Sequence, residues 1–168
     1  LYGLPYDAID VVVHPQSIVH SFVEFVDGSV LAQMGLPTME LPILYALSYP
    51  DRVADGVLRT FDPVRSSSLT FEDIDHEAFP MFGVGVSAGR REGTAPAVFN
   101  AGNEIAVQAF LDERIRFPEM AEVVATAVDE VAVADEPASV EEVLAADGEA
   151  RRVSREVVGR MEERVKAP

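Results

Sequence analysis

Two hydrophobic patterns divide the chain. Up to about residue 34 the apolar residues follow the period of β-strands, and from residue 79 onward they follow the period of helices. Residues 9–13 (IDVVV) form a β-branched run, which predicts a strand buried on both faces and stopped by Pro15. Apolar and polar residues then alternate over residues 18–26, which predicts a second strand. The first part of the chain therefore reads as β-structure.

The dipeptide Asp27-Gly28 predicts a hairpin with a two-residue type I′ turn and a return strand over residues 29–34. In that register Val26 pairs with Ser29, and His20 lies opposite Gly35. Directly opposed residues have side-chain roots about 5 Å apart. We therefore expect the His20 imidazole beside the Gly-x-Pro-x-Met turn of residues 35–39. A slip of one residue would move His20 to the other face of the hairpin.

The rest of the chain predicts one short helix, a connector and four longer helices. Pro42 suits the first turn of the short helix and Pro50 ends it. Residues 51–78 have no sustained period, apart from a strand-like patch at residues 69–71, and are expected to run along the protein surface. Helical periods follow over residues 79–91, 94–115, 118–131 and 139–165. Ser139 and Glu142 form a capping-box pattern before the last of these helices, and Gly148 could break or kink it.

These elements predict an α+β fold in three parts. Residues 1–60 contain the strands and the short helix, residues 61–78 are the connector, and residues 79–168 form an antiparallel four-helix bundle. The chain begins at Leu1 without a methionine and soon enters a strand pattern. We therefore expect it to be the C-terminal part of a longer protein.

Composition excludes several kinds of function. The net charge of −16 argues against nucleic-acid binding, because a phosphate backbone would be repelled. With no cysteine there can be no disulfide, thiolate zinc site or cysteine nucleophile. The sequence has neither an apolar run long enough to span a membrane nor an N-terminal signal pattern. A cytoplasmic protein is expected.

Candidate functional residues are few. His14 and His20 are six positions apart across a proline, which is not a metal-binding spacing, and His76 lies in the connector. His20 could be structural, or it could donate a hydrogen bond to a phosphate or hydroxyl group. Met39 could fill a core or pack on a flat apolar ring. The cluster that contains Asn100, Asn103 and Glu104 is unusual in a helix because asparagine is a poor helix former, and we favour a structural lock on the connector over a ligand site.

Several longer motifs occur in a fixed order along almost the whole chain. They are HPQSIVHS at residues 14–21, Asp27-Gly28-Ser29, Ala32-Gln33, Gly35-x-Pro37-x-Met39, YPDRV at residues 49–53 and FNAGNE at residues 99–104. In these motifs the sequence resembles the 1-deoxy-D-xylulose 5-phosphate reductoisomerase family. That family usually has alanine where Gly102 stands.

The resemblance implies an NADPH- and metal-dependent enzyme of the non-mevalonate isoprenoid pathway, of which this chain is the C-terminal part. It implies that His20 borders the active site as a polar aligner, and that Pro37 and Met39 pack near the nicotinamide. The ligands for Mg²⁺ or Mn²⁺ and the residues that hold the substrate phosphate are expected upstream of Leu1. A homodimer is also implied, with these strands in the sheet at its interface.

Two functions remain open from the sequence. The chain could be the C-terminal portion of a reductoisomerase that converts 1-deoxy-D-xylulose 5-phosphate to 2-C-methyl-D-erythritol 4-phosphate, and then it should be inactive alone. It could instead be a non-catalytic helical module for interaction or dimerisation. A stably folded dimer formed by the isolated chain would favour the second function.

Overall fold

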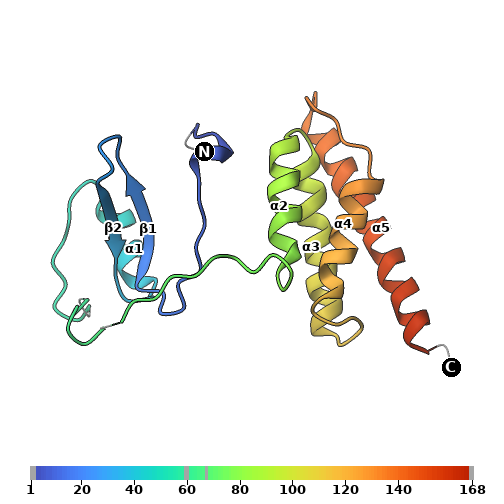
Figure 1. The fold of residues 1–168 in the computed structure, drawn as a ribbon. Helices are drawn as coiled ribbons and strands as arrows, with labels where there is room; N and C mark the ends of the chain where they lie inside the picture. The colour runs from blue at the N-terminus through green and yellow to red at the C-terminus, as the bar shows by residue number, and fades with distance from the viewer. Residues whose placement is uncertain (1–2, 59–60, 67, 167–168) are drawn as a thin grey trace. The chain divides into compact units, whose positions relative to one another are not determined.

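The computed structural model describes residues 3–58, 61–66 and 68–166. These residues form two compact units, shown in Figure 1. The hairpin unit comprises residues 7–74, and the helical unit comprises residues 75–168 together with the segment up to Tyr6. The fold is α+β: a two-stranded sheet, a short 3₁₀ helix at Tyr6–Ala8 and five α-helices are described. Among the described residues, no helix has the length and apolar character needed to cross a membrane.

The hairpin unit contains strands β1 (Val19–Glu24) and β2 (Val30–Met34) and helix α1 (Glu40–Ser48). The predicted hairpin and short helix are thus confirmed. The expected strand over residues 9–13 is wrong: only Val13 is paired, through an isolated antiparallel bridge to Glu72. Those residues are rich in β-formers, but strand formation needs a neighbouring backbone, and within the described chain only Glu72 provides one.

The hairpin turn also differs from the prediction. Glu24 pairs with Val30, and the Phe25 N–H donates to the Ser29 carbonyl at 2.9 Å, so the loop is the three residues 26–28. Gly28 has a φ of 82°, the left-handed value that a three-residue hairpin loop commonly requires. Ser29 donates to the Asp27 carboxylate from its hydroxyl at 2.6 Å and from its backbone N–H at 2.9 Å. Hydrogen bonds from Ser29 hold the pKa of Asp27 below its ordinary value.

A second irregularity lies at the start of β1. Val19 pairs with Met34 and Ser21 pairs with Gln33, so His20 has no ladder partner of its own. This is a β-bulge, an extra residue that bends a strand and redirects a side chain. The predicted register was therefore wrong by one residue near the turn, and the bulge changes it again at His20.

The helical unit contains α2 (Pro80–Arg91), α3 (Ala95–Leu111), α4 (Glu119–Glu130) and α5 (Val140–Lys166), which Figure 1 shows side by side. These helices match the four predicted ones, and Gly148 lies inside a continuous α5. The capping prediction is confirmed, because the Glu142 N–H donates to the Ser139 hydroxyl at 3.3 Å. The Glu142 carboxylate in turn accepts from the Ala138 N–H at 2.8 Å.

The core of the chain lies in the helical unit, where α3 contacts each of the other three helices. Apart from Met161, its members are small or branched aliphatic residues, chiefly Ala95, Val98, Ala101, Ala106, Ala109, Val123, Val124, Ala127, Val128, Ala150, Val153, Val157 and Val158. Small residues let the helix backbones approach closely. At Gly102, an added Cβ would lie 3.4 Å from the Ala127 Cβ and 3.4 Å from the Ser154 hydroxyl, so an alanine would fit without a severe clash.

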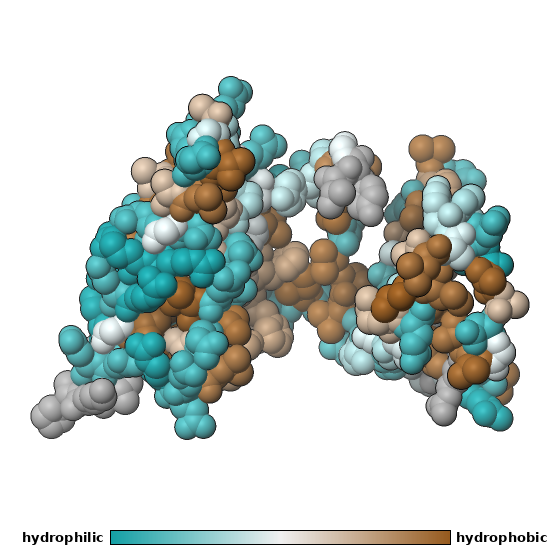
Figure 2. Space-filling model, turned by 180° about the vertical axis from the view of Figure 1, so that it is seen from behind, coloured by the Kyte–Doolittle hydropathy of each residue, from teal (hydrophilic) through white to brown (hydrophobic). Residues whose placement is uncertain are grey.

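The hairpin unit has almost no core of its own. Ile18 and Gly35 are its only buried residues in the part of the chain that is described. Phe22, Val23, Leu31 and Leu47 are all exposed, and Figure 2 shows apolar side chains on the surface of this unit. Such a large exposed apolar surface is typical of a region that packs against further protein.

Candidate functional site

The His20 side chain and Gly35 form one corner of the hairpin unit. The imidazole Nε2 of His20 lies 3.6 Å from the position that a Cβ on Gly35 would occupy. The Gly35 N–H donates to the Ile18 carbonyl at 2.9 Å, which fixes Gly35 against the start of β1. The expected closeness of His20 and Gly35 is thus confirmed, although the bulge produces it rather than the predicted register. His20 is exposed and therefore accessible to a ligand.

The turn from Gly35 to Met39 leads directly into α1. Gly35 is buried, while Pro37 and Met39 are exposed, with 68% of Met39 accessible. The Ile43 N–H donates to the Met39 carbonyl at 3.0 Å, so Met39 is held at the start of the helix. A mobile side chain on a fixed backbone is suited to cover one face of an apolar ring.

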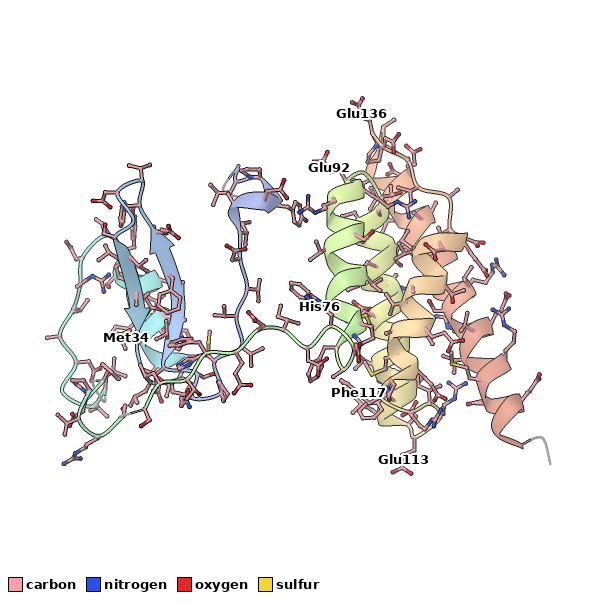
Figure 3. All side chains as sticks on the ribbon, viewed as in Figure 1. Met34, His76, Glu92, Glu113, Phe117 and Glu136 are labelled. Atoms are coloured by element: carbon pink, nitrogen blue, oxygen red, sulfur yellow. The ribbon has the colours of Figure 1, made fainter. Side chains whose placement is uncertain are left out.

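A hollow of about 770 Å³ lies beside this turn, between the end of β2, the start of α1, residues 53–58 and Phe61. Its lining includes Met34, labelled in Figure 3, together with Gly35 and Leu36. Neither His20, Pro37 nor Met39 lines it. The structure therefore brings His20 close to Gly35 but leaves Pro37 and Met39 outside the hollow.

His14 and Gln16 form a second cluster, which sequence reasoning missed. His14 Nδ1 lies 2.8 Å from the Thr70 carbonyl, and the His14 ring stacks on Phe71 with centroids 4.5 Å apart. Since a carbonyl only accepts, Nδ1 carries a proton and donates it to Thr70. Nε2 is buried, with no hydrogen-bond partner among the described residues. The signal for Gln16 in the sequence was its place in the HPQS motif.

No metal site is found in the described residues, where no group of three histidine, aspartate or glutamate side chains could hold an ion. His14 is engaged by Thr70 and Phe71, and His76 lies near Phe82 in the helical unit with ring centroids 5.9 Å apart. These residues of the chain therefore do not fit the ligand set of a divalent cation.

The asparagine-rich cluster joins two helices, and the expected lock on the connector was wrong for two of its three residues. Asn100 donates to Glu104 at 3.1 Å, and Glu104 accepts from Arg151 of α5 at 2.7 Å. The hydrogen bond from Arg151 is the main reason that the pKa of Glu104 lies below its ordinary value. Arg151 also pairs with Asp147 at 2.7 Å. Periodicity places residues on a helix face, but it does not identify the helix opposite.

Asn103 is the exception in that cluster. It lines an apolar pocket of about 140 Å³ together with Ala78 and Phe79, where the predicted connector ends, and with Phe117, labelled in Figure 3. No hydrogen bond from Asn103 to those residues is found in the described structure. The pocket belongs to the helical unit and is separate from the His20 corner.

Comparison with known proteins decides the family. A family model described as the DXP reductoisomerase C-terminal domain matches residues 34–153. The chain belongs to the DXP reductoisomerase family. The match contains the Gly35–Met39 turn, α1 to α4 and the first half of α5.

Two curated relatives illustrate the extent of the likeness. The 1-deoxy-D-xylulose 5-phosphate reductoisomerase of Nocardia farcinica is 55% identical over 163 residues, which is 95% of this chain and 40% of that protein. The enzyme of the same name from a Synechococcus strain is 50% identical and covers 90% of this chain and 38% of its own length. The chain thus spans about two fifths of these relatives.

Solved DXP reductoisomerases share the fold. The enzyme of Zymomonas mobilis, in complex with NADPH, superimposes with a TM-score of 0.87 at 39% identity, covering 94% of this chain and 41% of that one. A DOX-P reductoisomerase in complex with NADPH, fosmidomycin and magnesium gives a TM-score of 0.81 at 37% identity, covering 88% of this chain and 38% of that one. The likeness therefore extends through both units.

Proposed function

We propose that this chain is the C-terminal portion of an NADPH-dependent reductoisomerase that converts 1-deoxy-D-xylulose 5-phosphate to 2-C-methyl-D-erythritol 4-phosphate. The observation that carries the proposal is 55% identity to the Nocardia farcinica enzyme over 95% of the chain. The exposed His20 beside Gly35, and the exposed Met39 on the turn that follows, supply one wall of such a site.

In this proposal the chain's own residues bind and orient. NADPH supplies the hydride, and Mg²⁺ or Mn²⁺ stabilises negative charge on the substrate oxygens. Pro37 and Met39 present apolar surface to the nicotinamide ring, and they keep water from that face. The His20 imidazole donates to a hydroxyl or phosphate oxygen and aligns it. Gly35 packs beside that ring, where an added Cβ would lie 3.6 Å from Nε2, an ordinary contact distance. Metal coordination is not assigned to the described residues.

The proposal extends to the architecture and the assembly. We infer that α2–α5 form a four-helix bundle that follows the end of a catalytic domain, and that the enzyme is a homodimer. The exposed apolar residues of the hairpin unit support an interface there, since they would be covered in a larger sheet. A cytoplasmic location stays a prediction from the sequence.

Two assays test the function. The reductoisomerase that contains this chain should oxidise NADPH when 1-deoxy-D-xylulose 5-phosphate and Mg²⁺ are added; no oxidation would refute the proposal. The 168-residue chain alone should show no turnover under the same conditions, because its described residues offer no metal site. Turnover by the isolated chain would contradict its assignment as a partial site.

A further inference from the structure

The side-chain amide of Gln16 forms hydrogen bonds with Thr70, a residue 54 positions away. The Gln16 Nε2 donates to the Thr70 hydroxyl at 2.8 Å, and the Gln16 Oε1 accepts from the Thr70 N–H at 3.1 Å. A glutamine is suited to this task because it offers a donor and an acceptor on one planar group. Next to this contact, Val13 and Glu72 exchange two backbone hydrogen bonds of 2.9 and 3.0 Å.

The residues that follow Gln16 lead directly to His20 and its contact with Gly35. Ser17 has a φ of 51°, a left-handed conformation that costs energy in a residue other than glycine and persists only where its surroundings hold it. Ile18 follows, is buried, and accepts the Gly35 N–H on its carbonyl at 2.9 Å. His20 then occupies the bulge. Only four positions therefore separate the Gln16 side chain from the His20 ring.

We propose that Gln16 is a positioning residue for the His20–Gly35 corner. By holding Thr70, Gln16 fixes the bend at Ser17, and this bend sets the direction of the Ile18 carbonyl and the place of the His20 imidazole. Gln16 itself touches neither cofactor nor substrate in this scheme. The expected effect of Gln16 on catalysis rests on the proposed function, whereas its effect on the geometry of His20 and Gly35 does not.

The first test measures the corner without catalysis. Hydrogen exchange at the Gly35 amide, read by mass spectrometry of peptides that span it in the full-length protein, reports the bond to Ile18. Gln16→Ala should speed that exchange about 3- to 10-fold, the loss expected for a net hydrogen-bond contribution of about 1 kcal/mol. Unchanged exchange at Gly35 would overturn the proposal.

Matched variants distinguish the loss of the Gln16–Thr70 hydrogen bonds from a general loss of stability. Thr70→Val removes only the hydroxyl partner and should speed Gly35 exchange less than Gln16→Ala. The double variant should resemble Gln16→Ala, because both changes remove one contact. Gln108→Ala is the control: it removes another exposed glutamine hydrogen bond, to Asp112 at 2.9 Å in the helical unit, and should leave Gly35 exchange unchanged. Equal acceleration by Gln108→Ala would contradict a local role.

The second test uses the enzyme. Gln16→Ala should raise the KM for NADPH about 3- to 10-fold with little change in the melting temperature, whereas Gln108→Ala should change neither value. If the unmodified enzyme lacks reductoisomerase activity, the proposed function fails, and Gly35 exchange still decides the role of Gln16. If Gly35 exchange accelerates while all kinetic constants stay constant, the role of Gln16 in catalysis is refuted.

Discussion

At the scale of single residues, the candidate site consists of common side chains in exposed positions. His20 is an ordinary exposed histidine, and Met39 is an ordinary exposed methionine. The backbone determines where these side chains lie, since a bulge directs His20 toward Gly35 and Met39 is held at the start of α1. Substitutions at such positions should change ligand affinity more than stability.

Met39 provides a direct prediction for the cofactor. Met39→Ala should raise the KM for NADPH about 2- to 10-fold, because contacts between methionine sulfur and a ring are worth about 0.3–1.5 kcal/mol. Steady-state kinetics of the full-length enzyme measure this value. Leu144→Ala on α5 also removes an exposed apolar side chain and serves as the control. An unchanged KM in the Met39 variant would refute the assigned contact.

Thr94 provides a prediction for stability. Thr94 is buried, its hydroxyl accepts from the Ala134 N–H at 3.0 Å, and its own N–H donates to the Ala134 carbonyl at 2.9 Å. Thr94→Val keeps the shape but leaves a part-buried N–H without its partner, which should cost about 1–3 kcal/mol of the free energy of unfolding. Urea denaturation measures the loss. Thr126→Val, which removes a hydroxyl bonded within its own helix, should cost much less.

At the scale of elements, contacts between helices involve charge as well as the apolar core. Glu104 on α3 and Arg151 on α5 pair at 2.7 Å, and Arg114 pairs with Glu162 of α5. These bridges are partly exposed, so each contributes modestly and depends on the ionisation of its carboxylate.

Glu104 supplies a prediction for pH. Its pKa is lowered in the folded chain, chiefly by the hydrogen bond from Arg151, so its stabilising contribution is complete above the ordinary value of 4.5 and is lost as the pH falls through the lowered value. Glu104→Gln should therefore lower the melting temperature at pH 7, with a smaller difference from the unmodified chain at pH 3. Thermal melts across this range test it.

A control for that experiment is Glu136→Gln. Figure 3 shows Glu136 at the tip of the loop between α4 and α5. The Glu136 variant should melt like the unmodified chain at both pH values. A Glu104 variant whose melting temperature differs equally from the unmodified chain at pH 3 and pH 7 would show that the bridge is not the source of the effect.

At the scale of the whole chain, stability is unevenly distributed. The helical unit holds an extended buried core, whereas Ile18 and Gly35 are the only buried residues of the hairpin unit in the described ranges. Buried apolar surface is the main stabilising contribution to folding. The two units should consequently differ in the free energy of opening.

Hydrogen exchange of the isolated 168-residue chain tests this difference. Amides in α3 and α4 should be protected at least about 100-fold more than amides in β1 and β2, because protection follows the free energy of opening. In the full-length reductoisomerase the strands should gain protection, since further protein would cover them. Equal protection of both units in the isolated chain would show that the hairpin unit is stable by itself.

Local rules were sufficient for the features that depend on neighbouring residues. The four long helices, the Ser139 cap, the short helix α1 and the existence of the hairpin all follow from periods and turn residues. The motif resemblance was likewise enough to identify the family. The same rules placed His20 beside Gly35, although they relied on the wrong register.

Only the tertiary structure decided which distant segments meet. Three features each depend on a backbone or side chain that approaches from elsewhere in the chain. They are the bulge at His20, the hydrogen bonds between Gln16 and Thr70, and the salt bridge between Glu104 and Arg151. Residues 9–13 also show that composition does not supply a partner, because they are rich in strand formers but form only the bridge from Val13 to Glu72 in the described chain. A period identifies a face of an element, but the partner of that face is set by the packing of the whole chain.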